Sequence, residues 1–193
     1  MKRINPKLSL AIVLIIFLLL FGFASGYRLD GLSAARANAF VPKDSVLLDA
    51  VEYDWGGVYI FDSIEKPVTA ISIKSHGFLW SSRSSVYYYH HNDPIKTIGG
   101  ASLSHGREET TVISILVDDP KVSYLEVGPT GNRVKKEASS RNPMTFAWNE
   151  SVQFDRLYPK AFDKDGKLLY EYRYLQTNFT RSEDLRWYPT TQE

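Results

Sequence analysis

The sequence contains no cysteine among its 193 residues. Disulfide bridges, cysteine nucleophiles, iron–sulfur clusters and thiolate zinc sites are therefore excluded, as is a lipid anchor attached to cysteine. An exported domain without disulfides has to gain its stability from the burial of apolar surface. About 165 residues follow the amino-terminal apolar run, enough for one domain with a substantial core.

The chain also lacks an excess of charge of either sign. It has 23 lysine and arginine residues against 22 aspartate and glutamate residues. Three of the basic residues, Lys2, Arg3 and Lys7, precede the apolar run, which leaves 20 basic against 22 acidic residues after it. This balance gives no electrostatic reason to expect nucleic acid as a partner.

Signatures of catalysis and of cofactor binding are missing as well. There is no Gly-x-Ser-x-Gly nucleophile elbow, and the turn at Gly128 lacks the ending of a phosphate-binding loop. The stretch ending at Gly166 looks like a calcium loop, but the alignment puts Ala161 and Tyr172 where carboxylates are needed. We expect a β-turn at Gly166, no cofactor and no enzymatic activity, with a hydrolase of dispersed site residues as the less favoured alternative.

Histidines are few, and their spacing predicts no metal site. The four are His76, His90, His91 and His105. Adjacent residues of a strand point to opposite faces, so His90 and His91 cannot join one site. One of them could combine with another histidine and Asp93 or Glu108, but nothing in the spacing requires it.

What the sequence does contain is a long uncharged run from Leu8 to Gly26. As a helix it just reaches across a hydrocarbon core of about 30 Å. The basic residues before it predict an amino terminus inside the cell and a carboxyl-terminal domain outside. The alternative is a cleaved signal peptide, with possible sites at residues 24–26 and 37–39, but the run is longer than the usual signal core.

Three regions follow from this: a stub and anchor (1–26), a stem (27–45) and an exported β domain (46–193). In the stem, Asp30 could cap a short alanine-rich helix that Pro42 would end. Its small side chains offer little surface to bury, which favours a spacer between membrane and domain.

The exported region reads as many short strands separated by turns. Strands are expected at residues 46–53, 58–62, 68–74, 95–104, 110–117, 122–127 and 168–174, with a bend at Gly99 and Gly100. Met144, Phe146 and Trp148 share one side of a further strand. The tail after Leu175 is polar. We predict a mainly β fold, an antiparallel β-sandwich or barrel-like domain behind a transmembrane helix.

Residues 110–172 resemble the immunoglobulin-like extracytoplasmic modules of membrane-anchored proteins in Gram-positive bacteria. The phrases Asp-Pro-Lys-Val at 119–122 and Ala-Phe-Asp-Lys-Asp-Gly-Lys-Leu-Leu-Tyr at 161–170 carry the resemblance. Those modules are mostly non-catalytic, so the resemblance implies no site residue.

Aromatic residues are abundant, at 13% of the chain, with a dense cluster at residues 78–89. If residues 86–91 form a strand, Val86 and Tyr88 share the buried face, and Tyr87, Tyr89 and His91 lie nearer solvent. With Trp80, these three form a candidate interaction surface. The leading hypothesis is a single-pass, non-catalytic domain that binds or scaffolds an envelope protein; the alternative is a module that binds cell-wall carbohydrate.

Overall fold

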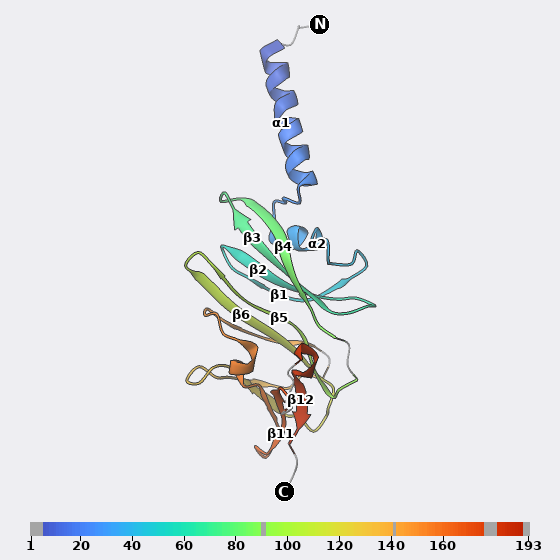
Figure 1. The fold of residues 1–193 in the computed structure, drawn as a ribbon, viewed down its shortest axis with the longest axis vertical. Coiled ribbons are helices and arrows are strands. Elements are labelled where there is room, and N and C mark those ends of the chain that lie inside the picture. The colour runs from blue at the N-terminus through green and yellow to red at the C-terminus, as the bar shows by residue number, and fades with distance from the viewer. Residues whose placement is uncertain (1–5, 90–91, 141, 176–180, 191–193) are drawn as a thin grey trace.

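The computed structural model describes residues 6–89, 92–140, 142–175 and 181–190. An isolated helix, α1 (Pro6–Ala24), is followed by a short helix, α2 (Gly31–Arg36), and then by three antiparallel sheets stacked in layers (Figure 1). This confirms the prediction of a mainly β antiparallel fold behind one apolar helix.

The first sheet, sheet A, is a meander of four consecutive strands. They are β1 (Val46–Glu52), β2 (Gly56–Asp62), β3 (Val68–Ser75) and β4 (Leu79–Tyr87). Sheet A therefore forms from strands that are neighbours in the sequence.

The chain crosses between sheets B and C more than once, so strands that are consecutive in the sequence belong to different sheets. Sheet B has the order β5 (Ile95–His105), β6 (Glu108–Val117), β9 (Met144–Trp148). Sheet C has the order β12 (Arg186–Pro189), β11 (Leu168–Arg173), β10 (Lys160–Phe162), β7 (Tyr124–Val127), β8 (Val134–Glu137). Two 3-10 turns, η1 (Phe154–Leu157) and η2 (Ser182–Asp184), lie between strands of the second half.

Sheet B is the middle layer and supplies side chains to two separate cores. Val112 of β6 packs with Val58 and Ile60 of sheet A, and all three are fully buried. The next residue, Ile113, points the other way into the core shared with sheet C, where Leu125 also lies. Successive residues of a strand face opposite sides, so β6 has to present apolar side chains on both faces. Val112 does so toward sheet A, and Ile113 and Ile115 do so toward sheet C.

The bend predicted at Gly99 and Gly100 is present in β5. The register with β6 shifts between Thr97 and Gly99. A Cβ atom at Gly99 would lie 2.6 Å from Cγ2 of Ile60, so the two sheets approach too closely here for any larger residue. The glycine is required by the packing of sheet A on sheet B.

Helix α1 is exposed along its whole length, and residues 7–24 are long and apolar enough to cross a membrane. A signal sequence near the amino terminus can meet the same criteria of length and composition.

The stem packs against the domain, and the expectation that it has little surface to bury is wrong. Asp30 caps α2, as predicted, by accepting a 2.7 Å hydrogen bond from the Ser33 amide. Ala34 and Ala35 are fully buried, and Ala35 joins the cluster on the outer face of sheet A that contains Phe61. Alanine allows this because a small side chain lets the helix backbone lie close to the sheet.

Two strands differ from the prediction. β4 ends at Tyr87, so residues 86–91 are not one strand, and Val86, expected in the core, is 41% exposed. The polar tail contains β12, whose Trp187 is buried in the core between sheets B and C. Both strands lie at sheet edges, where one open side requires less apolar sequence.

Candidate functional site

The residues predicted as an interaction surface do not lie together. Trp80 is at the start of β4 and Tyr87 at its end, seven residues and about 23 Å apart for an extended strand. Trp80 is half-buried beside the link to α1, where its backbone pairs with Arg28. Tyr87 and Tyr89 are 51% and 46% exposed. His91, like His90, lies outside the described residues.

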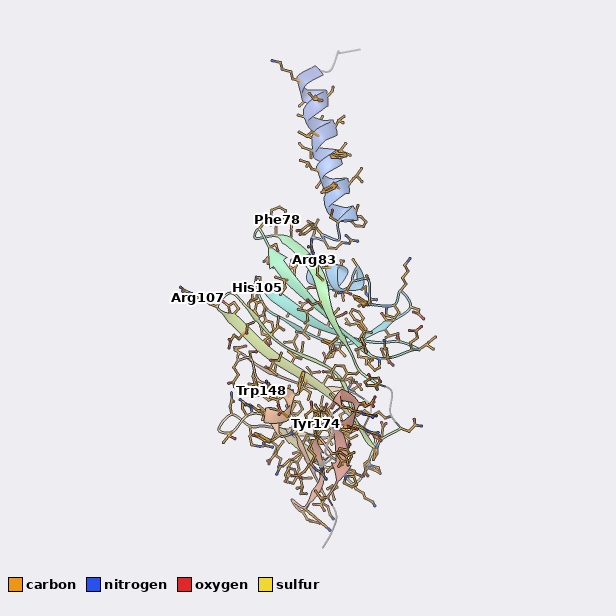
Figure 2. The ribbon with its side chains drawn as sticks, in the orientation of Figure 1. Phe78, Arg83, His105, Arg107, Trp148 and Tyr174 are labelled. Carbon is orange, nitrogen blue, oxygen red and sulfur yellow. The ribbon has the colours of Figure 1, made fainter. Side chains whose placement is uncertain are left out.

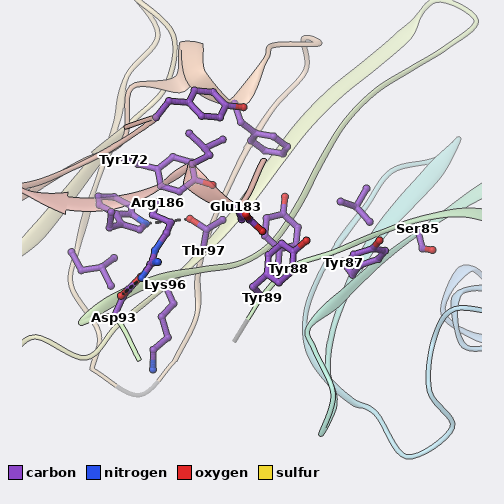
Figure 3. A pocket seen from close by; sticks show the side chains of 16 residues that line it. Ser85, Tyr87, Tyr88, Tyr89, Asp93, Lys96, Thr97, Tyr172, Glu183 and Arg186 are labelled. Carbon is purple, nitrogen blue, oxygen red and sulfur yellow. Dashed lines mark hydrogen bonds and ion pairs between the residues drawn. The ribbon is translucent and has the colours of Figure 1, made fainter. Parts of the chain in front are cut away.

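A cleft of about 470 Å³ opens where the end of β4 meets sheets B and C. Its walls come from the β4 end and the residues after it, the start of β5, β11, η2 and β12 (Figure 3). The volume falls in the range of small-molecule and peptide side-chain pockets. Tyrosine dominates the lining: Tyr87, Tyr88, Tyr89, Tyr172 and Tyr174.

A second, more open cavity adjoins the cleft and has a volume of about 960 Å³. It runs between sheet A and the 3-10 turn η1. Val86, Phe154, Tyr174 and Leu185 line both cavities, which therefore lie side by side. We call the two adjoining cavities the tyrosine groove.

The tyrosine rings in the groove are fixed in different orientations. Tyr87 and Tyr89 are 6.5 Å apart between ring centroids, with their planes 83° apart. The Lys66 ammonium lies 3.6 Å from the Tyr87 ring centroid. The Tyr88 hydroxyl donates a 3.2 Å hydrogen bond to the Gly100 carbonyl, and burial raises its pKa well above the ordinary value. The rings thus do not form the coplanar row that stacks on a sugar.

Tyr172 and Trp187 form the floor of the cleft. Their ring centroids are 5.5 Å apart, and both side chains are buried. The Trp187 indole donates a 3.1 Å hydrogen bond to the Thr97 hydroxyl. Burial raises the pKa of Tyr172 to about 12, so this phenol stays neutral at any physiological pH.

The charged groups at the cleft are paired. Arg186 makes a bidentate contact with Asp93, at 2.6 Å and 3.0 Å, in the labelled pair of Figure 3. Hydrogen bonds to that carboxylate raise the pKa of the guanidinium. Lys96 pairs with Asp118, and Glu183 with Arg181. The cleft therefore offers apolar and aromatic surface with little unbalanced charge.

The residues that the structure describes bring together no cluster of metal ligands. Within these residues no group of three or more histidine, aspartate or glutamate side chains could hold a metal ion. His105 stacks on Trp55 at a centroid distance of 6.1 Å, and His76 lies in the β3–β4 turn with a φ of 52°. The turn at Gly166 is held by Asp163, whose carboxylate accepts hydrogen bonds from two following amides, and it is the predicted β-turn.

Sequence reasoning missed the far wall of the groove. Arg186 and Trp187 lie in the polar tail, and Asp93 is 93 residues away from its partner Arg186. The aromatic pair at 187–188 was the available signal, because a Trp-Tyr pair in a polar tail is typical of a strand that packs on a core.

Comparison of the chain with protein-family models, with characterised proteins and with solved structures finds no match. The resemblance of residues 110–172 to immunoglobulin-like modules therefore stays an interpretation of the sequence.

Proposed function

We infer that the protein is a membrane-anchored, non-catalytic binding protein of the cell envelope. In this proposal α1 is an uncleaved anchor with the amino terminus inside, and the β domain lies outside. The tyrosine groove receives an extended segment of another envelope protein, which inserts apolar side chains. The apolar and aromatic side chains shared by the two adjoining cavities support this proposal best.

The extent of the groove favours a polypeptide segment over a compact ligand. Two adjoining cavities of about 470 and 960 Å³ lie at the junction of the sheets, and four apolar or aromatic side chains line both. A segment bound there would bury apolar side chains, and each Å² of apolar surface removed from water contributes about 25 cal/mol to the free energy of binding. Tyrosine is also one of the residue types enriched among the residues that contribute most to binding at protein interfaces.

Carbohydrate fits less well, for two reasons. The Tyr87 and Tyr89 planes differ by 83°, so a flat sugar face cannot stack on both rings. The polar groups that could hold sugar hydroxyls, such as Arg186 and Thr97, already bond to protein partners.

The test uses the full chain in lipid nanodiscs and a library of displayed random peptides. We expect enriched peptides to share aromatic or aliphatic side chains and to bind through the groove. Tyr87→Ala should weaken their binding about tenfold, which corresponds to about 1.4 kcal/mol, as loss of an interface tyrosine does. Tyr158→Ala is the matched control, because Tyr158 is 49% exposed and outside the groove.

A parallel arm offers β-linked glucosamine oligosaccharides to the same proteins. Oligosaccharide binding that Tyr87→Ala abolishes would overturn the polypeptide proposal in favour of carbohydrate. Peptide binding that is equally insensitive to Tyr87→Ala and Tyr158→Ala would remove the groove as the site.

A further inference from the structure

The link between α1 and sheet A is short and closed by hydrogen bonds. The Tyr27 amide bonds to the Gly22 carbonyl at 3.0 Å, which continues the hydrogen bonding of the helix end. One residue later, Arg28 and Trp80 exchange two backbone hydrogen bonds of 2.8 Å each. Arg28 thereby adds a β-bridge to the outer edge of β4, and the helix is held against the sheet without a free spacer.

The Arg28 side chain holds the helix end from the other side. Its guanidinium donates to the carbonyls of Phe23 and Tyr27, at 2.8 Å and 2.7 Å. It also lies 3.7 Å from the centroid of the Phe23 ring. A cation that satisfies carbonyls at a helix carboxyl terminus is favoured by the helix dipole.

An apolar groove of about 480 Å³ lies between the last turns of α1 and the domain. Leu18, Leu19 and Phe23 line it from the helix, and Leu29 and Phe78 from the domain. Leu29 is 76% exposed and Phe78 is 61% exposed. Phe78 is labelled in Figure 2 at the tip of the β3–β4 turn, next to the end of the helix.

The length of α1 fixes where this groove lies in a bilayer. Its 19 residues span about 28 Å, slightly less than a hydrocarbon core of about 30 Å. No turn of the helix is left over to hold the domain away from the lipid. Leu18 and Leu19 then lie inside the hydrocarbon, and the groove they share with Leu29 and Phe78 opens onto the same leaflet.

We propose that this groove is occupied by phospholipid, and that Leu29 and Phe78 insert into the leaflet into which α1 runs. The proposal rests on α1 being a membrane anchor, as in the proposed function. Basic and aromatic residues beside the groove suit the headgroup level: Arg83 lies 5.8 Å from the Tyr27 ring centroid (Figure 2 labels Arg83 below the helix end). Sheet A is thereby fixed on the membrane surface.

The test exploits the absence of cysteine, because each single-cysteine variant carries one label. Leu29→Cys, Phe78→Cys, Leu14→Cys and Ile64→Cys are labelled with the fluorophore NBD in nanodiscs of phosphatidylcholine and phosphatidylglycerol. Ile64 is the control, since it is 90% exposed in the β2–β3 turn, at the other end of sheet A. At Leu29 and Phe78 we expect emission at shorter wavelength than at Ile64, and a loss of intensity with doxyl-labelled lipid.

Leu14→Cys reports on the anchor itself and separates the two proposals. Quenching at Leu14 together with water-like emission at Phe78 would overturn the lipid contact and leave the anchor intact. Water-like emission at Leu14 would overturn the anchor and the contact together. Short-wavelength emission at Phe78 without quenching by doxyl-labelled lipid would mean that protein fills the groove, which also contradicts the proposal.

Discussion

The replacement Ile113→Ala should destabilise all three sheets at once. Ile113 is fully buried in the core between sheets B and C. Three carbons are lost, worth about 2.4 kcal/mol at about 0.8 kcal/mol each, and the cavity left behind raises the cost toward about 3.5 kcal/mol. For a domain of this size 1 kcal/mol corresponds to about 2–4 °C, so the melting temperature should fall by about 7–14 °C.

The neighbouring replacement Val112→Ala probes the other core of the same strand. It removes two carbons from the core between sheets A and B, worth about 1.6 kcal/mol before the cavity is counted. Because β6 belongs to both cores, we expect each replacement to lower the melting temperature of the whole domain. A replacement in one core should not leave the other sheet pair folded.

The assay is thermal unfolding of the full chain in detergent, with the tryptophans replaced by 5-fluorotryptophan. Fluorine NMR spectra recorded at each temperature monitor the unfolding. Trp55 and Trp80 report on sheet A, while Trp148 and Trp187 report on the core between sheets B and C. All four signals should lose intensity at one temperature in each variant. Ile64→Ala, at a position 90% exposed, should change the free energy of unfolding by less than about 0.5 kcal/mol.

One result would refute the reasoning about a shared middle layer. If Ile113→Ala lowers the transition of Trp148 and Trp187 while Trp55 and Trp80 stay native, sheet A unfolds independently. Two transitions in the unaltered protein would lead to the same conclusion.

Three further predictions follow from single contacts. Gly99→Ala should cost about 1–3 kcal/mol by overpacking against Ile60, and unchanged denaturant midpoints would show that the sheets can separate. Because the pKa of Tyr172 is raised from 10.0 to about 12, its neutral form contributes stability that is fully present below pH 10 and is lost between about pH 10 and 12. Tyr172→Phe should flatten that loss in denaturation measured across this range, and an equally steep loss would contradict the assignment. Asp30→Ala should cost about 1 kcal/mol by removing the cap bond to Ser33, measured by urea denaturation, whereas no change would mean that α2 contributes little.

The parts of the fold that the sequence predicted are those with a strong local pattern. Met144, Phe146 and Trp148 alternate with smaller or polar residues, and all three are buried in β9. The glycine pair at 99–100 marks the bend in β5, because only glycine lets sheet A approach so closely. These signals depend on residues adjacent in the chain, so a local reading can detect them.

The parts that the sequence did not predict depend on distant partners. β4 contains four serines and one arginine in a row at 81–85, with no strand pattern, yet it pairs along β3. β12 forms because β11 offers an open edge and Trp187 fills a gap in the core. The far wall of the tyrosine groove has the same origin, since Arg186 of sheet C reaches Asp93, just before β5, only after sheets B and C have packed.

The middle position of sheet B imposes an order on folding during synthesis. Strands β1 to β4 can pair as soon as they are made, but the face that carries Val58 and Ile60 is uncovered until β5 and β6 emerge. Once β6 is in place, Ile113 and its neighbours remain uncovered until the chain reaches Trp187. A nascent chain therefore exposes first the apolar face of sheet A and then the apolar face of sheet B. These two faces are where a chaperone would bind before synthesis is complete.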